Sequence, residues 1–278
     1  MGTAEIAQEY GLTHFPNIAC NEYGTPLLNS MVSWVDQRAS NSIIVYANVD
    51  VVFNNSLIVA INRAVENQER RRRRNFVIIG QTLDVRVDYE IAFERSNWEA
   101  NLIDSANHRG NLRVGRDYFV YARGFWGEMP AFAVARPAWD KWAIFRALEL
   151  GADVIDATDV ILAIHQNHQF VTDLEDSVYK NRWNGPEAEQ NRHLAGDWAR
   201  RFGTEDANWK MGDKKIAPVI SRRRFIKLIQ KCFAKEPGMI RVLGYLGKLL
   251  YPERFFPFFD RGNKNKRYFS PEKTKQAS

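Results

Sequence analysis

Acidic and imidazole side chains that follow apolar segments could do chemistry in this sequence. Asp50 comes shortly after the apolar run 43–47, and His165 and His168 follow the apolar stretch 160–164. One carboxylate oxygen and one imidazole, with further positions left open, suit Mn²⁺ or Mg²⁺ carrying a phosphate-bearing ligand. We expect one of the two histidines to reach such a site. The alternatives are a capping aspartate and structural histidines.

Asp140 is the third candidate. It lies in the first turn of a helix that Pro137 is expected to open. The helix dipole stabilises a carboxylate there as an anion, so it could accept a proton from a nearby hydroxyl. The alternative is that Asp140 only caps the helix.

Apolar periodicity predicts the elements that position these residues. Strands are expected at 43–47, 76–79 (closed by Gly80), 83–87, 118–121, 132–134, 153–157 and 160–164. Helices are expected from a cap at Asn55 or Ser56 through 65, at 93–107, at 137–150 with Gly151 as the stop, and near 187–200, with a loop at 110–115. Alternating strands and helices indicate an α/β layer with a mixed sheet, where ligands bind at the carboxyl ends of strands.

Composition narrows the class of protein. The chain has 278 residues and two cysteines, which excludes a disulfide framework and a cysteine-rich zinc site. No apolar run approaches the roughly 20 residues that a membrane span needs. The first ten residues contain Glu5 and Glu9 and no apolar run, so no signal peptide is expected. We therefore expect a cytoplasmic protein in a reducing compartment.

The formal net charge of +6 hides a basic C-terminal part. Residues 210–278 contain 18 Lys and Arg against 5 Asp and Glu. Residues 221–234 predict a basic amphipathic helix, which could lie on an anionic membrane surface, such as the inner face of a membrane, or pack on the body of the protein. We favour packing. The run Arg70–Arg74 predicts an exposed helix end, and nucleic-acid binding is not expected because no aromatic platform is interleaved with it.

Four further segments, read in order, carry a family resemblance. They are 21–27 (NEYGTPL), 46–50 (YANVD), 129–142 (MPAFAVARPAWDKW) and 154–168 (VIDATDVILAIHQNH). Together they resemble the GT-A class of nucleotide-sugar glycosyltransferases, and within it a group found in bacteria, viruses and plants. The second segment resembles that group's variant of the Asp-x-Asp metal motif, with Asn48 in place of the first acid. The family continues its last motif with Asp-Tyr, where this chain has Gln169-Phe170.

The resemblance implies a fold and a division of the chain. A GT-A-like (Rossmann-like) mixed sheet flanked by helices is expected over residues 1–172, and a helical, basic extension over 173–278. The family's usual first strand would precede the point where this sequence starts, so part of the donor pocket is expected to be missing.

The resemblance also implies roles for individual residues. Asp50, with His165 or His168, would bind Mn²⁺ or Mg²⁺ bridging the diphosphate of the donor. Asp140 would match the acid that serves as base in inverting members. The expected donor-binding residues are Asn48, Gly80, Arg123, Arg136, Gln166 and Asn167.

Two functions are compatible with these expectations. The first is a metal-dependent glycosyltransferase, of the hexosyl- or deoxyhexosyltransferase type, that moves a sugar from a nucleotide-diphosphate donor to a hydroxyl of a glycan or polysaccharide precursor. The second is a non-catalytic or truncated GT-A-like scaffold that binds a glycan or a partner protein.

Overall fold

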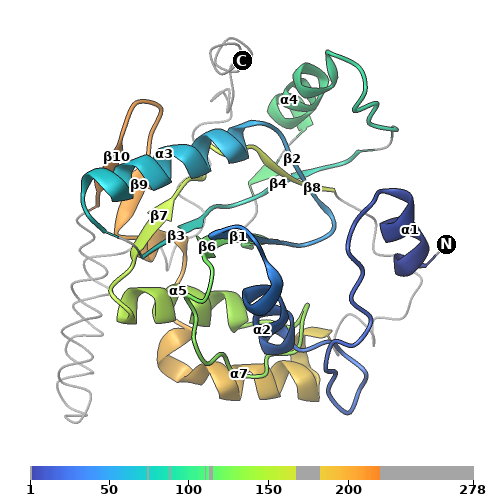
Figure 1. Cartoon of the computed structure of the whole chain (residues 1–278), viewed down its shortest axis with the longest axis vertical. Coiled ribbons are helices and arrows are strands. Elements are labelled where there is room, and N and C mark those ends of the chain that lie inside the picture. Colours follow the sequence, from blue (N-terminus) through green and yellow to red (C-terminus); the bar gives the residue numbers. More distant parts are fainter. Residues whose placement is uncertain are drawn as a thin grey trace. The chain divides into compact units, whose positions relative to one another are not determined.

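The chain has a mixed α/β fold (Figure 1). The computed structural model describes residues 2–73, 75–87, 89–109, 111–112, 115–166 and 182–219. The chain divides into two compact units: unit 1 combines 1–44, 121–150 and 169–202, and unit 2 combines 45–120, 151–168 and 203–278.

Strands and helices are distributed over both units. The strands are β1 Ile43–Ala47, β2 Val51–Phe53, β3 Phe76–Ile79, β4 Leu83–Val85, β5 Asn111–Leu112, β6 Tyr118–Ala122, β7 Asp153–Asp156, β8 Ala163–Gln166, β9 Trp209–Met211 and β10 Ile216–Pro218. The helices are α1 Thr3–Glu9, α2 Leu28–Arg38, α3 Ser56–Arg70, α4 Trp98–Arg109, α5 Trp139–Glu149, α7 Pro186–Ala199 and the 3₁₀ turn η1 Thr204–Asp206.

The larger sheet has the order β1-β6-β3-β7-β9-β10 and is mixed. β3 is parallel to β7, β7 is parallel to β9, and β10 runs antiparallel to β9. All four residues of β3 are buried, as a continuous apolar run on a central parallel strand predicts. In unit 2, α3 lies along this sheet in Figure 1. Its last turn is fixed there by Arg71, which pairs with Asp153 and lies 3.8 Å from the ring centre of Trp209.

The smaller sheet has the order β2-β8-β4-β5, with α4 beside it (Figure 1). β8 is antiparallel to β2 and parallel to β4. Leu83, Val85 and Ile164 from these strands pack with Leu102 and Ile103 of α4 in one buried cluster. The alternation along a strand therefore turns Asp84 and His165 to the opposite face of the sheet.

Unit 1 is held by aromatic packing and by two polar clamps. Helices α5 and α7 lie side by side (Figure 1), and the ring centres of Phe145 and Phe202 are 5.1 Å apart. The buried side-chain amide of Asn191 accepts from the backbone N–H of Ala133 and donates to its carbonyl. The carboxylate of Glu187 accepts from Arg136 Nε at 2.9 Å and from Asn21 at 2.7 Å.

Most of the expected elements are confirmed. β1 and β3 have the expected bounds, and β4, β6, β7 and α7 lie at the expected places. Gly151 ends the helix before it with a positive φ of 71°. The arginine run is indeed a helix end, since α3 stops at Arg70 and Arg72 has a φ of 53°.

Several expected strands and loops are corrected by local hydrogen bonding. Residues 132–134 are not a strand, because Asn191 satisfies the backbone of Ala133, which otherwise forms only an isolated bridge with Leu27. β8 begins at Ala163 rather than at residue 160, because the amides of Val160 and Ile161 turn back to the carbonyl of Ala157. The expected loop 110–115 contains the short strand β5.

Helix starts are also corrected. α5 begins at Trp139 and not at Pro137. Ala138 has a left-handed φ of 89°, so it cannot belong to a right-handed helical turn. α4 begins at Trp98 instead of residue 93. Asn55 is the N-cap of α3, one of the two expected positions, but its side chain makes no capping bond, and the amide of Ser56 donates to the side chain of Asn54. The sequence patterns did not indicate α1, α2, β2, β9 or β10.

Some expectations fall outside the described residues. They include the boundary at residue 173, Asn167, His168 and the basic helix 221–234. Among the helices of the described ranges, none combines the length and apolar character that crossing a membrane requires.

Gly80 is expected to tolerate no larger residue. A Cβ added to Gly80 would lie 2.0 Å from the hydroxyl of Tyr118, and Tyr118 is fully buried. We predict that Gly80→Ala lowers the free energy of unfolding by about 1–3 kcal/mol through overpacking. Tyr118→Phe, which removes that hydroxyl, should recover part of the loss. Urea denaturation of both single variants and the double variant measures the coupling, and strictly additive effects would contradict this packing.

The stability of unit 1 should depend on the ionisation of Glu187. Burial raises the pKa of its carboxyl, but hydrogen bonds from Asn21, Thr25 and Arg136 and the charge of Arg136 together hold that pKa below the ordinary 4.5. A lowered folded-state pKa contributes stability above pH 4.5, and this contribution is lost as the pH falls through the folded value. Glu187→Gln should therefore cost about 2 kcal/mol at pH 7 and progressively less in acid.

Urea denaturation at pH 7 and at pH 3.5 tests this expectation. Glu189→Gln, which changes an exposed acid on the same helix turn, is the matched control and should have little effect at either pH. A cost for Glu187→Gln that stays constant down to pH 3.5 would contradict the assigned role.

Candidate functional site

Asp50, His165 and Asp84 form a compact cluster in unit 2. His165 Nε2 lies 3.2 Å from Asp50 Oδ2, and His165 Nδ1 lies 2.8 Å from Asp84 Oδ1. The imidazole is 9% exposed, whereas each carboxylate is 30% exposed. The structure thus brings together two of the three expected metal ligands and adds a carboxylate that the sequence reasoning missed.

Strand register explains why these three side chains meet. β8 lies between β2 and β4, and His165 is the direct cross-strand partner of Asp84. Direct partners project from the same face of a sheet. Asp50 immediately precedes β2, and its carbonyl accepts a hydrogen bond from the backbone N–H of Gln166 at 2.9 Å. That bond holds the Asp50 backbone at the end of β8.

The cluster fits part of a divalent-cation site. Two ligands at right angles on an ion with bonds of about 2.1 Å are about 3 Å apart, close to the 3.2 Å between His165 Nε2 and Asp50 Oδ2. Asp84, on the far ring nitrogen, is placed to orient the imidazole, as carboxylates behind metal-binding histidines do. Over the described ranges, no group of three or more His, Cys, Asp or Glu side chains is arranged so that it could hold a metal ion.

A second polar network surrounds Asn48. Asn48 Nδ2 donates to Asp117 Oδ1 at 3.0 Å, and Tyr46 donates its hydroxyl to Asn48 Oδ1 at 3.2 Å. Thr82 donates to the other oxygen of Asp117 at 2.7 Å. Burial, Asp117 and Asp50 raise the pKa of Tyr46 to about 12, so its hydroxyl keeps its proton at neutral pH. Asn48 is therefore held in one orientation, with the carboxylate of Asp117 beside it.

Two other expected donor-binding residues belong to unit 2. Gly80 follows β3 and lets the buried Tyr118 ring approach its backbone, so close packing requires a glycine there. Gln166 is the last residue of β8 and anchors Asp50 through its backbone. A donor-binding role for Gly80 and Gln166 stays a prediction. The same holds for Asn167, which lies outside the described residues, as does His168.

The remaining expected site residues belong to unit 1. Asp140 lies in the first turn of α5, as expected, and is partly exposed. Arg136 is held by Glu187 and Thr25, and Arg123 donates to the carbonyl of Ala39. Both arginines therefore stabilise unit 1, and their contact with a donor diphosphate stays a prediction.

Sequence reasoning missed Asp84 and Asp117 for different reasons. Asp84 stood out only as a polar member of an alternating strand, and nothing local indicated that its strand would pair with β8. Asp117 precedes β6, and its contact with Asn48 joins residues 69 positions apart. The one available signal for Asp84 was its place as a carboxylate between the buried apolar residues of its strand.

Comparisons with protein-family models, with curated proteins and with solved structures returned no match.

Proposed function

We propose that the chain is a metal-dependent, GT-A type glycosyltransferase that moves a sugar from a nucleotide diphosphate to a hydroxyl of a glycan or polysaccharide precursor. The observation that carries the proposal is the approach of His165 Nε2 to Asp50 Oδ2, with Asp84 behind the imidazole. Their positions in the sequence matched two separate motifs of that family, 115 positions apart. The positions of both residues after apolar segments led to the expectation that they share one cation, and the resemblance implied the same pair.

The proposed chemistry is a transfer between two oxygens. The acceptor hydroxyl oxygen attacks the anomeric carbon, and the bond from that carbon to the diphosphate oxygen breaks. The nucleoside diphosphate leaves with the bonding electron pair, and the acceptor hydroxyl loses its proton. A cation held by Asp50 and His165 would neutralise the charge that develops on the diphosphate.

The chain's own residues would prepare this step. Asp84 orients the imidazole of His165, and Asp117 with Tyr46 fixes the amide of Asn48 beside Asp50. In an inverting reaction Asp140, at the start of α5, would take the proton of the acceptor hydroxyl, as the resemblance implies. Asp140 is thus the proposed base, and Asp84 and Asp117 are positioning residues.

Nucleotide binding tests this function directly. We predict that one of UDP, GDP, dTDP and CDP raises the unfolding temperature of the full chain, and only with Mn²⁺ present. At a ligand concentration one hundred times Kd the native state gains about 2.7 kcal/mol, which corresponds to several degrees. Asp50→Asn should remove the shift. Asp84→Asn should weaken Mn²⁺ binding by about 10- to 100-fold.

The matched control is Asp159→Asn, which changes an exposed carboxylate of unit 2 that pairs with Lys210 outside the cluster. It should leave the Mn²⁺-dependent shift intact. A Mn²⁺-dependent shift of the unfolding temperature that persists in Asp50→Asn would contradict the assignment of Asp50 as a metal ligand. A cooperatively unfolding chain that responds to none of the four nucleotides would favour the non-catalytic scaffold instead.

A further inference from the structure

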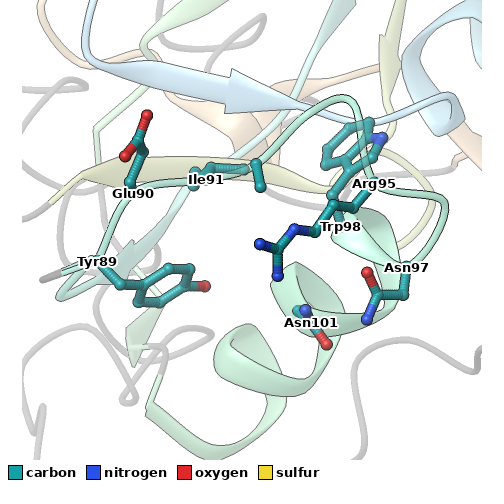
Figure 2. Close-up of a pocket in the computed structure, with 8 residues that line it drawn as sticks. Tyr89, Glu90, Ile91, Arg95, Asn97, Trp98 and Asn101 are labelled. Atoms are coloured by element: carbon teal, nitrogen blue, oxygen red, sulfur yellow. The ribbon is translucent and has the colours of Figure 1, made fainter.

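A small surface pocket lies where the loop after β4 meets the start of α4 (Figure 2). Its volume is about 220 Å³, and its main lining residues are Tyr89, Ile91, Arg95, Asn97, Trp98 and Asn101. Pockets for drug-sized ligands measure about 300–1,000 Å³, so this pocket has room for one small ring. All of these residues belong to unit 2.

The floor of the pocket is apolar, and packing and a hydrogen bond hold it in place. Ile91 and Trp98 pack against the buried cluster formed by β4, β8 and α4. The ring of Trp98 is also met edge-on by Phe93, with ring centres 5.1 Å apart. The start of α4 is tied down further, because Glu99 accepts a hydrogen bond from the backbone N–H of Asn55. The aromatic floor is therefore present before any ligand binds.

The polar groups of the pocket converge from its rim. Figure 2 shows the guanidinium of Arg95 between the hydroxyl of Tyr89 and the amide of Asn101, while the carboxylate of Glu90 points away. Tyr89 is held in place by Ser105, at 3.1 Å. Across the part of the chain that the structure describes, the Arg95 guanidinium has no ion-pair or hydrogen-bond partner.

This combination selects a particular kind of ligand. An aromatic face packs against the apolar face of a sugar ring, and side-chain amides both donate to and accept from hydroxyls. A guanidinium recognises a carboxylate or a phosphate by charge-assisted hydrogen bonds. We propose that this pocket binds one acidic sugar unit: a hydroxyl-bearing ring on Trp98, with its anionic group on Arg95 and its hydroxyls on Asn97 and Asn101.

The pocket is separate from the Asp50–His165 cluster. Leu83, Val85 and Ile164 face α4 and the pocket floor, whereas Asp84 and His165 project from the other face of the same sheet. Sugar binding at the pocket therefore does not depend on the proposed transferase activity. If that activity holds, the pocket would bind a unit of the acceptor glycan away from the reacting hydroxyl.

Titrations of the full chain, followed by the chemical shifts of its own amide groups, test the proposal without nucleotide or metal. The probes are glucuronic acid, glucose 6-phosphate, glucose and inorganic phosphate. Both acidic sugars should bind more tightly than glucose, and Arg95→Gln should weaken them about tenfold or more while leaving glucose unchanged. Asn101→Ala should weaken all three sugars. Arg73→Gln, at an exposed arginine outside the pocket, is the matched control and should change nothing.

The two acidic sugars separate the possible sources of the anion. Tighter binding of glucuronic acid would indicate a uronate unit, and tighter binding of glucose 6-phosphate a phosphorylated sugar. The proposal is overturned if neither acidic sugar binds, if both bind no better than glucose, or if Arg95→Gln binds them as the parent chain does. It is also overturned if inorganic phosphate binds as tightly as glucose 6-phosphate, because the ring would then contribute nothing.

Discussion

The pairing of β8 between β2 and β4 is the constraint on which both candidate sites depend. In this register Ile164 joins the apolar cluster under α4, and His165 faces Asp84 directly across the strand pair. A slip of one residue would exchange the two faces, placing an imidazole among leucines and an isoleucine beside the carboxylates. The apolar face therefore fixes the register, and the register fixes the geometry of the polar face. The same apolar face packs against Trp98, which lines the surface pocket beside α4.

The carboxylates of the candidate site contact its other polar side chains and not only solvent. Asp84 lies behind His165, and Asp117 holds Asn48, so each of these two side chains has an acidic partner from a different strand or loop. Such partners reduce the number of orientations that the imidazole and the amide can adopt, which is what a preorganised ligand site requires. Asp50 stays 30% exposed and is thus accessible to an ion from solvent.

The parts of the fold that could be predicted are those with a strong local signal. The apolar runs of β1, β3 and β6 and the apolar periodicity of α3 were sufficient to predict these elements. β2, β9 and β10 have three residues each, too few for periodicity to reveal, and they exist through pairing with distant strands. The apolar stretch 132–134 looked like a strand, but the Asn191 amide takes over its backbone hydrogen bonds. The proximity of Asp50 and His165 was expected from their positions after apolar segments and from the resemblance, whereas the contacts of Asp84 and Asp117 depend on strand register and on residues distant in the sequence.

Donor turnover is the measurement that tests the transferase account most directly. The purified chain is incubated with UDP-, GDP-, dTDP- and CDP-linked sugars and Mn²⁺, and the release of free nucleoside diphosphate is followed, first to water and then to added glycans. The account predicts release from sugars of one nucleotide class, abolished by removal of the metal with EDTA. Release that continues unchanged without metal would contradict the role given to Asp50 and His165. No release from any donor, with or without glycan, would contradict the assignment as a transferase.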